Sequence, residues 1–420
     1  MRRRTLLMGL LAAAAAAPGF RLPLVDAGSH AGKLFVFVQA DGGWDPTSFC
    51  DPKTNTRGEP VINHWAQRDE VRQAGNIPYA PFAGNAAFFE KYYQRILVIN
   101  GVDAQTNSHT VGVVHNWSGR NSEGYPTLSA LLAAYYAPAL PIPYLSFGGF
   151  SVTSGITRFT RIDNAGLLHE IAYPTADTYS FSAADWAAIE GHRAETAARL
   201  AAAPGLLPAD ERHLAYYRSA FATEGLRAYA DVIPPEDELE PEEDGGGFGS
   251  SLRRQAQLTV LAFRTGVAVS ADLYLGGFDT HDNHDDDHGW LLGNLTTGVD
   301  YLWEYAELHG VADRLVVVIG SDFGRTNFYN SQRGKDHWPI GSYIVMEKNQ
   351  RWTNHVVGLT DELHFAYAID PHSLRRDDQG GTIIYPKHVH KALRRYLGIE
   401  HSAGALRFPF NNTEDFQFFT

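Results

Sequence analysis

The sequence predicts an α/β fold with a mainly parallel sheet that is sandwiched by helices. Six short apolar runs, rich in β-branched and aromatic residues, have the pattern of buried parallel strands. They cover residues 33–39, 95–100, 143–148, 271–277, 314–321 and 342–346. Apolar residues at helical spacing precede two of these runs, at 252–265 and 291–303. Such an alternation of strands and helices is typical of this fold class.

A helical, alanine-rich segment without strand signals extends from Ser182 to about Ile233. The stretch behind it, "PPEDELEPEEDGGGFGSS" at 234–251, carries seven acids and no base and ends in glycine and serine. Such a composition predicts a flexible linker or a surface loop. We therefore expect one α/β domain over residues 31–420, with a helical insertion at about 182–233 and an acidic linker at 234–251.

The N-terminal segment "MRRRTLLMGLLAAAAAAPGF" has three arginines, an apolar run and then small residues, which is the pattern of a cleaved export signal. The apolar run at 6–17 is shorter than the roughly twenty residues that a bilayer span needs. Residues 3–7, "RRTLL", resemble the twin-arginine signal, and a general secretory signal is the alternative. We expect residues 1–30 to be removed and the mature protein to be exported to the periplasm by the twin-arginine pathway, without a transmembrane anchor.

The formal net charge of -13 argues against nucleic acid or an anionic membrane surface as a partner. A small-molecule or cell-envelope substrate is the expected partner instead. Cys50 is the single cysteine of the chain, so no intramolecular disulfide can form. We expect Cys50 to be a small buried residue.

Acids and histidines follow several of the predicted strands. In an open α/β sheet, ligands bind beyond the carboxyl ends of the strands. The residues concerned are Asp41 and Asp45 after 33–39, Asp279, His281 and His284 after 271–277, Asp322 and Arg325 after 314–321, and Asp336 and His337 on the loop before 342–346. Carboxylates and imidazoles without thiolates suit a divalent metal such as zinc, manganese or iron. Such an ion can activate a water molecule or polarise an ester oxygen.

The segment at 106–120, "TNSHTVGVVHNWSGR", follows the predicted strand at 95–100. A hydroxyl and histidine cluster at such a place can supply a nucleophile. We expect His109, with Ser108 or Thr110, at the reacting end of the site, although hydroxyl residues also begin helices without any catalytic role.

Other polar residues have a simpler structural interpretation. The acids at 285–287 stand just before a helix that is predicted to begin near Gly289, where negative charge stabilises the positive end of the helix dipole. The segment "YPKHVHKALRRYLGI" predicts an amphipathic helix with His388 and His390 on its polar, solvent-facing side.

The motifs "GGFDTH", "SDFGRT" and "GKDHWP", in this order, resemble an uncharacterised family of exported bacterial proteins. That family is assigned to the alkaline phosphatase and sulfatase superfamily. "SHTVGVVHNWSGR" and the following "YPTLSALLAAYY" fit the family as well. The resemblance extends from Lys33 to about Leu397 and is weakest across 150–250. It implies an alkaline phosphatase-like fold and a metal site more than it implies a particular reaction.

The resemblance also implies roles for individual residues. Asp41 matches the first metal-binding aspartate of the superfamily, with Asp45 as a competing choice. Asp279 and His284 resemble its aspartate and spaced histidine, Asp322 the aspartate of its Asp-His pair, and His337 its closing histidine.

Two departures from the superfamily pattern limit what it implies. Phe323 stands where a two-metal phosphatase has histidine. The oxidisable Cys-x-Pro/Ala-x-Arg motif of sulfatases is missing, because Cys50 is followed by Asp51, Pro52 and Lys53. A formylglycine-type sulfatase is therefore not expected, and a one-metal or altered site is possible.

Together these patterns lead to the hypothesis of an exported metal-dependent hydrolase of a phosphate or sulfate ester or a related cell-envelope substrate. The expected metal ligands are Asp41, Asp279, His281, His284, Asp322 and His337. The expected catalytic residues are His109, Ser108, Thr110, Arg325 and Lys335, of which Arg325 or Lys335 contacts an anionic group. The alternative is a non-catalytic envelope protein that keeps a sulfatase-like fold and binds glycan or protein.

Overall fold

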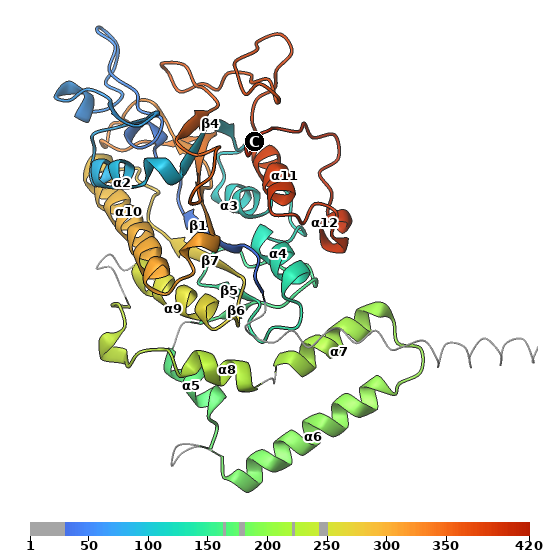
Figure 1. Cartoon of the computed structure of the whole chain (residues 1–420). Helices are drawn as coiled ribbons and strands as arrows, with labels where there is room; N and C mark the ends of the chain where they lie inside the picture. The colour runs from blue at the N-terminus through green and yellow to red at the C-terminus, as the bar shows by residue number, and fades with distance from the viewer. Residues whose placement is uncertain (1–29, 163–164, 176–180, 221–222, 243–250) are drawn as a thin grey trace, which may run out of the picture.

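The computed structural model of the chain describes residues 30–162, 165–175, 181–220, 223–242 and 251–420 (Figure 1). Residues 1–29 of the expected export signal and residues 243–250 of the expected acidic linker lie outside these ranges. No described helix combines the length and the apolarity that are needed to cross a bilayer.

An eight-stranded sheet forms the centre of the molecule. Its strands are β1 (Leu34–Ala40), β4 (Ile96–Asp103), β5 (Tyr144–Ser146), β6 (Thr160–Arg161), β7 (Ser270–Leu275), β8 (Leu315–Ser321), β11 (Ile340–Met346) and β12 (His355–Val357). They lie in the order β12-β4-β11-β8-β1-β7-β5-β6. Every neighbouring pair is parallel except those that involve β11. The predicted α/β class with a mainly parallel sheet is therefore confirmed.

Strand β11 corrects one expectation, because the run at 342–346 was predicted to be parallel. It pairs antiparallel with both β4 and β8. No helix separates β8 from β11; the chain instead turns back through a short antiparallel hairpin of β9 (Gly324–Arg325) and β10 (His337–Trp338). A chain without a crossover re-enters the sheet at the edge where it left it. The whole connection between β8 and β11 consequently lies at the carboxyl edge of the parallel strands.

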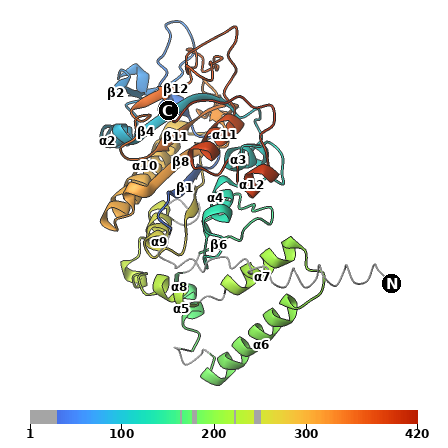
Figure 2. The same cartoon turned by 45° about the vertical axis from the view of Figure 1, so that its right-hand side comes forward.

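Helices cover both faces of the sheet, as the views in Figures 1 and 2 show. One face carries α2 (Asn85–Tyr92), α9 (Leu252–Arg264) and α10 (His284–Leu308); the other carries α3 (His109–Ser118), α4 (Leu128–Tyr136), α11 (Pro386–Tyr396) and α12 (Ala403–Arg407). Strand β1 supplies both cores by alternation: Val36 and Val38 join the first, Phe35 and Phe37 the second. Burial on both faces explains why the central strands are continuously apolar.

Short elements complete the fold. They are the hairpin β2 (Arg72–Ala74) and β3 (Ile77–Tyr79), and the 3-10 helices η1 (Pro46–Ser48), η2 (Trp65–Gln67), η3 (Tyr93–Arg95), η4 (Glu236–Glu238) and η5 (Ala312–Arg314). Of these, η1 matters for the site, because it holds the loop after β1. Its N-cap residue Asp45 accepts a hydrogen bond from the Thr47 amide at 2.9 Å.

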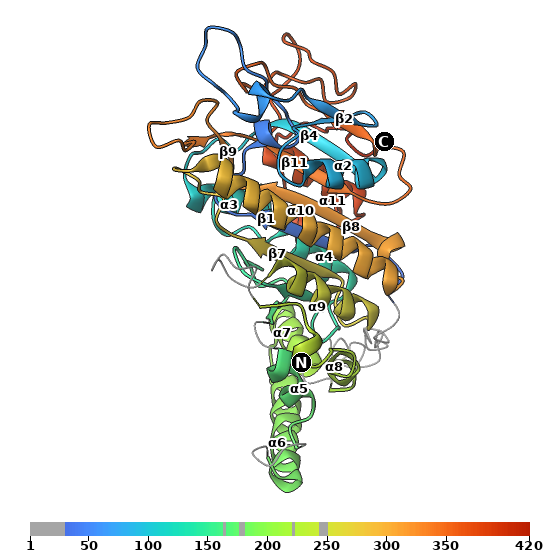
Figure 3. The same ribbon diagram turned by 90° about the vertical axis from the view of Figure 1, so that its left-hand side faces the viewer.

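Four further helices stand away from the sheet, beyond the β5 and β6 end (Figures 1 and 3). They are α5 (Ala165–Ala172), α6 (Ala183–Ala201), α7 (Pro208–Ala220) and α8 (Thr223–Ala230). The helical part therefore begins before Ser182, the start that the sequence suggested. Of the described residues in α6 and α7, Ala197 alone is buried. These two helices contribute little to the core and nothing to the edge of the sheet where the polar residues gather.

Helix α11 corrects the expectation for its two histidines. His388 and His390 are both fully buried. The Nε2 atom of His388 lies 2.9 Å from Glu414, and that of His390 lies 2.8 Å from the carbonyl of Asn116. The C-terminal segment folds back over α11, since His388 also packs against Phe416. Helical periodicity could not predict this cover, because it comes from residues beyond the helix.

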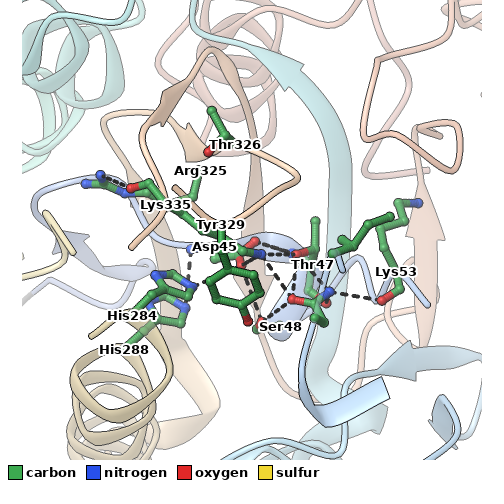
Figure 4. Close-up of polar contacts among 12 residues, drawn as sticks. Asp45, Thr47, Ser48, Lys53, His284, His288, Arg325, Thr326, Tyr329 and Lys335 are labelled. Atoms are coloured by element: carbon green, nitrogen blue, oxygen red, sulfur yellow. Dashed lines mark hydrogen bonds and ion pairs between the residues drawn. The ribbon is translucent and has the colours of Figure 1, made fainter. Parts of the chain in front are cut away.

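A buried ion pair fastens the loop after β1 to the loop between β9 and β10 (Figure 4). The Lys335 ammonium donates to the Asp45 carboxylate at 2.6 Å, and its other acceptors are Thr47 at 3.3 Å and Asn63 at 3.1 Å. Both charged side chains have 0% exposure. His284 lies 3.1 Å from the same carboxylate. Because each charge is paired and hydrogen-bonded, these contacts offset the large desolvation cost of burying the pair.

The pKa of Asp45 reports the strength of this arrangement. Burial by itself would raise that pKa, but the charge of Lys335 and the hydrogen bond from His284 hold it well below its ordinary value. A carboxyl group whose pKa is depressed by folding contributes stability above its unfolded pKa of about 4. That contribution is lost as the pH falls through the pKa of the folded state.

We predict that Asp45→Asn lowers the free energy of unfolding at pH 7 by about 3–5 kcal/mol, because it leaves a buried ammonium without its counter-charge. The deficit should shrink below about pH 4, where the wild type loses the advantage of its carboxylate. Urea unfolding of both proteins from pH 7 to pH 3 measures this difference. Asp69→Asn, at an exposed position, is the matched control and should show no deficit. A deficit for Asp45→Asn that stays constant over the whole pH range would contradict the prediction.

Candidate metal centre

Four side chains meet at the carboxyl edge of the sheet. The Oδ1 atom of Asp279 lies 3.3 Å from His109 Nε2, 3.0 Å from His281 Nε2 and 3.1 Å from His337 Nε2. The Nε2 atom of His337 is 3.0 Å from that of His109 and 3.0 Å from that of His281. Ligands of a tetrahedral metal with bonds of 2.0–2.1 Å are about 3.3 Å apart. The ligand atoms of His109, Asp279 and His337 all lie within 4.8 Å of one another, so these three fit a shared metal ion. His281 adjoins them through Asp279 and His337, and we call the four residues the ligand cluster.

In each of the three imidazoles, the hydrogen bond of Nδ1 orients the ring so that Nε2 faces the centre of the cluster. The Nδ1 atoms lie 2.5 Å from Asp322 for His109, 2.8 Å from Asp336 for His281, and 2.8 Å from the Asn107 carbonyl for His337. Carboxylate and carbonyl oxygens accept hydrogen bonds, so each Nδ1 can carry the proton and leave Nε2 as the ligand atom. The ligand atoms of His109, Asp279 and His337 are close enough together to hold one ion. Outer partners of this kind are what metal-binding histidines have.

Different elements carry the four ligands. His109 is the first residue of α3, and Asp279 and His281 follow β7. His337 belongs to β10, where it pairs with Arg325 of β9. The antiparallel return of the chain into β11 is what brings His337 to the same edge as the other three. A cluster assembled from three separate connections depends on the whole sheet for its geometry.

Arg325 holds Asp279 in place and does not reach solvent. Its Nη2 atom lies 2.7 Å from Asp279 Oδ1, and its Nε atom donates to the Gly43 carbonyl at 2.7 Å. Its other partners are the carbonyls of Gly42 and Lys335. Burial would raise the pKa of Asp279, but the hydrogen bond and charge of Arg325 lower it to about 2. Asp279 is therefore a carboxylate at any physiological pH, and the expected contact of Arg325 with an anionic group is not made in this geometry.

Asp322 lies behind the cluster, not within it. Its Oδ1 atom accepts the amide protons of Gly42 at 3.0 Å and Gly43 at 2.7 Å. Its Oδ2 atom is the partner of His109, and that hydrogen bond is the main reason why the pKa of His109 is raised. With 1% exposure and both oxygens occupied, Asp322 orients a ligand instead of binding the metal itself.

Two residues that the sequence assigned to the site lie in the buried network around Asp45 instead (Figure 4). The ring nitrogens of His284 are both used, by Asp45 at 3.1 Å and by the Thr280 hydroxyl at 2.6 Å. Lys335 is enclosed by three acceptors, as described above. His284 is the first residue of α10, and the start of the helix turns it away from the sheet edge. Neither side chain is free to bind a metal or a substrate there.

Three expected residues lie around the cluster without joining it. The Asp41 carboxylate accepts a hydrogen bond from the Tyr274 hydroxyl at 2.8 Å, and burial, followed by the charge of Asp322, raises its pKa. Ser108 and Thr110 are exposed at the start of α3. Among the described residues, no hydrogen bond joins either hydroxyl to the ligand cluster.

Phe323 occupies the position where a two-metal phosphatase has histidine. Its ring packs against His109 at 4.8 Å and His337 at 4.7 Å between centroids. The Phe323 ring offers no ligand atom, and Asp322 is not among the described residues whose ligand atoms come together here. The described residues therefore provide ligands for one ion at this place.

The sequence did not assign a role to Asp336, Asn107 or Tyr274. Asp336 precedes His337, and neighbouring side chains of an extended segment point to opposite sides. This alternation is a signal that one of the two could bind metal while the other supports it. The contributions of Asn107, through its carbonyl, and of Tyr274 depend on contacts between distant segments and have no signal in the sequence.

Comparison with known proteins gives one family and several solved structures. Residues 219–377 match the family described as "Protein of unknown function (DUF1501)". The matching segment is less than half of the chain; it includes Asp279, His281 and His337 but not His109. No curated protein matches the sequence.

The solved structures are similar at low identity. Ps i-CgsB in complex with k-i-k-neocarrahexaose has 8% identity and a TM-score of 0.42, over 92% of this chain and 75% of that chain. The 2-O GAG sulfatase BT1596 has 10% identity and a TM-score of 0.35, over 89% and 72%. The alkaline phosphatase from the Antarctic bacterium TAB5 has 10% identity and a TM-score of 0.32, over 77% and 94%. At TM-scores of 0.32 to 0.42 these similarities are weak, and the site has to be understood from its own residues.

Proposed function

We propose that this protein is an exported metal-dependent hydrolase of a phosphate or sulfate ester or a related cell-envelope substrate. The observation that carries the proposal is the ligand cluster, in which the Nε2 atoms of three imidazoles lie 3.0–3.3 Å from one carboxylate oxygen. Export is proposed from the N-terminal arginine, apolar and small-residue pattern alone.

The donor set suits the proposed chemistry. Nitrogen and oxygen ligands without thiolate favour zinc, manganese or iron. A divalent ion held there would lower the pKa of a water molecule and polarise an ester oxygen. Asp279 contributes one negative charge and a metal-bound imidazole carries none, so an ion of charge +2 would leave a net charge of +1. A net positive centre attracts an anionic ester.

The cluster has an open side for a substrate. The side chains of Asp279 and His281 are 45% and 42% exposed. The amino end of α3, which begins at His109, borders the same place and carries unpaired backbone amides that favour an anion. Ser108 and Thr110 can add hydroxyl donors to the oxygens of an ester group. These contacts replace those that Arg325 and Lys335 were expected to make.

Asp41 is the best candidate for proton transfer. Its raised pKa, caused first by burial, keeps a proton available nearer to neutral pH than on an exposed carboxyl group. The Tyr274 hydroxyl at 2.8 Å fixes the orientation of this carboxyl group. We assign Asp41 the transfer of a proton to the leaving oxygen of the ester.

One observation favours the alternative, a non-catalytic envelope binding protein. The side chain of His281 lies beside the other three, and a fourth protein ligand would fill the position that catalytic zinc sites usually keep open for water or substrate. In that case the metal would stabilise the fold while the open side of the cluster binds glycan or protein. Both functions need the metal, so metal content and turnover must be measured together.

We predict that the mature protein, purified through its own export route, contains about one divalent metal ion per chain and hydrolyses phosphate or sulfate esters. His337→Ala, which removes the ligand that contacts all three others, should lose most of the metal and the turnover. Mass spectrometry of bound metals and a panel of phosphate and sulfate esters measure both. His372→Ala, a histidine outside the cluster, is the control.

The outcomes separate the two functions. Absence of stoichiometric metal in the wild type would refute the proposal of a metal-dependent protein. Metal that depends on His337, without turnover on any ester, would favour the binding protein.

We also predict that Asp336→Asn weakens metal binding by about 10–100-fold, because outer partners orient the ligating histidine. Asp336 touches His281 and not the metal position, so binding should weaken without being abolished. Competition with a metal-binding dye measures the affinity, and Asp377→Asn, which lies outside this region, serves as the control. An unchanged affinity for Asp336→Asn would show that His281 is not a ligand.

A further inference from the structure

Two arginines meet at the opposite end of α3 from the ligand cluster. Arg120 follows α3, and Arg394 belongs to α11. Both guanidinium groups lie over the ring of Phe410, Arg394 at 4.1 Å and Arg120 at 5.1 Å from its centroid. Arg394 is only 3% exposed. Two like charges are therefore held together in a largely buried place.

Neither arginine has an acidic partner. Arg394 donates from Nη1 to the Phe408 carbonyl at 2.5 Å, and Arg120 donates from Nη2 to the Pro409 carbonyl. No carboxylate of the described residues forms an ion pair with either group. The Nε atoms of both, and Nη2 of Arg394, are buried without any hydrogen-bond partner.

This arrangement is costly as it stands. A buried charge without a counter-charge and buried N–H groups without acceptors both destabilise a fold. Burial, followed by the nearby charge of Arg120, lowers the pKa of Arg394 to about 9. Arg325 is equally buried in the same protein, but its guanidinium pairs with the Asp279 carboxylate and donates hydrogen bonds to three carbonyls.

The free groups of Arg394 have a defined geometry. Nε and Nη2 lie along one edge of the planar guanidinium, and that edge binds two oxygens of an anion in parallel. In Arg394 this edge is unpartnered, while Nη1, on the other side, is used. The unpaired Nε of Arg120 adds a third donor in the neighbouring group.

We propose that Arg394 and Arg120 bind a small tetrahedral oxyanion, phosphate or sulfate. Two guanidinium groups carry a charge of +2, which one doubly charged anion neutralises and one carboxylate does not. His390, one helical turn before Arg394, adds no charge, because burial lowers its pKa to about 3. The near-complete burial of Arg394 excludes a macromolecule as the partner.

This anion site is separate from the ligand cluster. His109 and Ser118 are the first and last residues of α3, about 14 Å apart at 1.5 Å per residue, and Arg120 lies beyond Ser118. The bound anion would hold α3, α11 and the segment around Phe410 together. Its role is therefore stabilisation of this side of the fold, whatever reaction the ligand cluster supports.

The test is thermal unfolding of the mature protein in chloride, acetate, sulfate and phosphate at matched ionic strength. We expect sulfate or phosphate to raise Tm in a saturable way, by about 3 °C at 100 times the Kd. Arg394→Met should lose this response. Arg395→Met, which removes a neighbouring arginine of α11 that pairs with Asp415, should keep it. Arg120→Met is the second variant, in case Arg394→Met does not fold.

Direct analysis completes the test. Ion chromatography of the supernatant after denaturing dialysed wild-type protein should give about one sulfate or phosphate per chain if the ion is retained. An equal, non-saturable rise of Tm in the wild type, in Arg394→Met and in Arg120→Met would overturn the proposal. So would an acetate response as large as that of sulfate, or a wild type that neither retains nor responds to either ion.

Discussion

The Gly42–Gly43 turn after β1 is the point on which the geometry of the ligand cluster depends. Its two amides donate to Asp322 and its two carbonyls accept from Arg325. Asp322 in turn orients His109, and Arg325 holds Asp279. Both glycines have positive φ values, 114° and 85°, and a Cβ atom at Gly42 would collide with the backbone of Asp279. One turn thus positions two of the four ligands through charged groups that never face solvent.

Some buried cations of this protein have an acidic partner and others do not. Around the sheet edge, each buried cation is matched: Lys335 by Asp45 and Arg325 by Asp279. These ion pairs hold the loops in place. Separating the two partners would leave an uncompensated charge inside the protein, which is strongly destabilising. Beside α11 the buried charges are not balanced. Arg394 and Arg120 both lie over the ring of Phe410, and no carboxylate of the described residues pairs with either. The contrast within one chain is the reason to expect an anion there.

Part of the candidate site could be predicted from the sequence. Asp279 and Asp322 follow strong strand patterns, and the carboxyl end of a parallel strand is a local property. The choice between His281 and His284 could not be predicted. Both follow the same strand, but α10 begins at His284 and directs it toward Asp45, while His281 remains in the loop at the sheet edge. Likewise, the charges of Arg325 and Lys335 suggested contact with a substrate, and only tertiary contacts show that both are buried.

By itself, the sequence determined where the strands lie and that they are buried, because continuous apolar runs and helical spacing are local patterns. The tertiary structure decided the direction of β11. An apolar run looks the same in either direction, so orientation depends on whether the preceding connection crosses the sheet or turns back. Here the chain turns back through the β9–β10 hairpin. That reversal brings His337 to the edge of the sheet where His109, His281 and Asp279 lie. No local sequence pattern predicts the reversal.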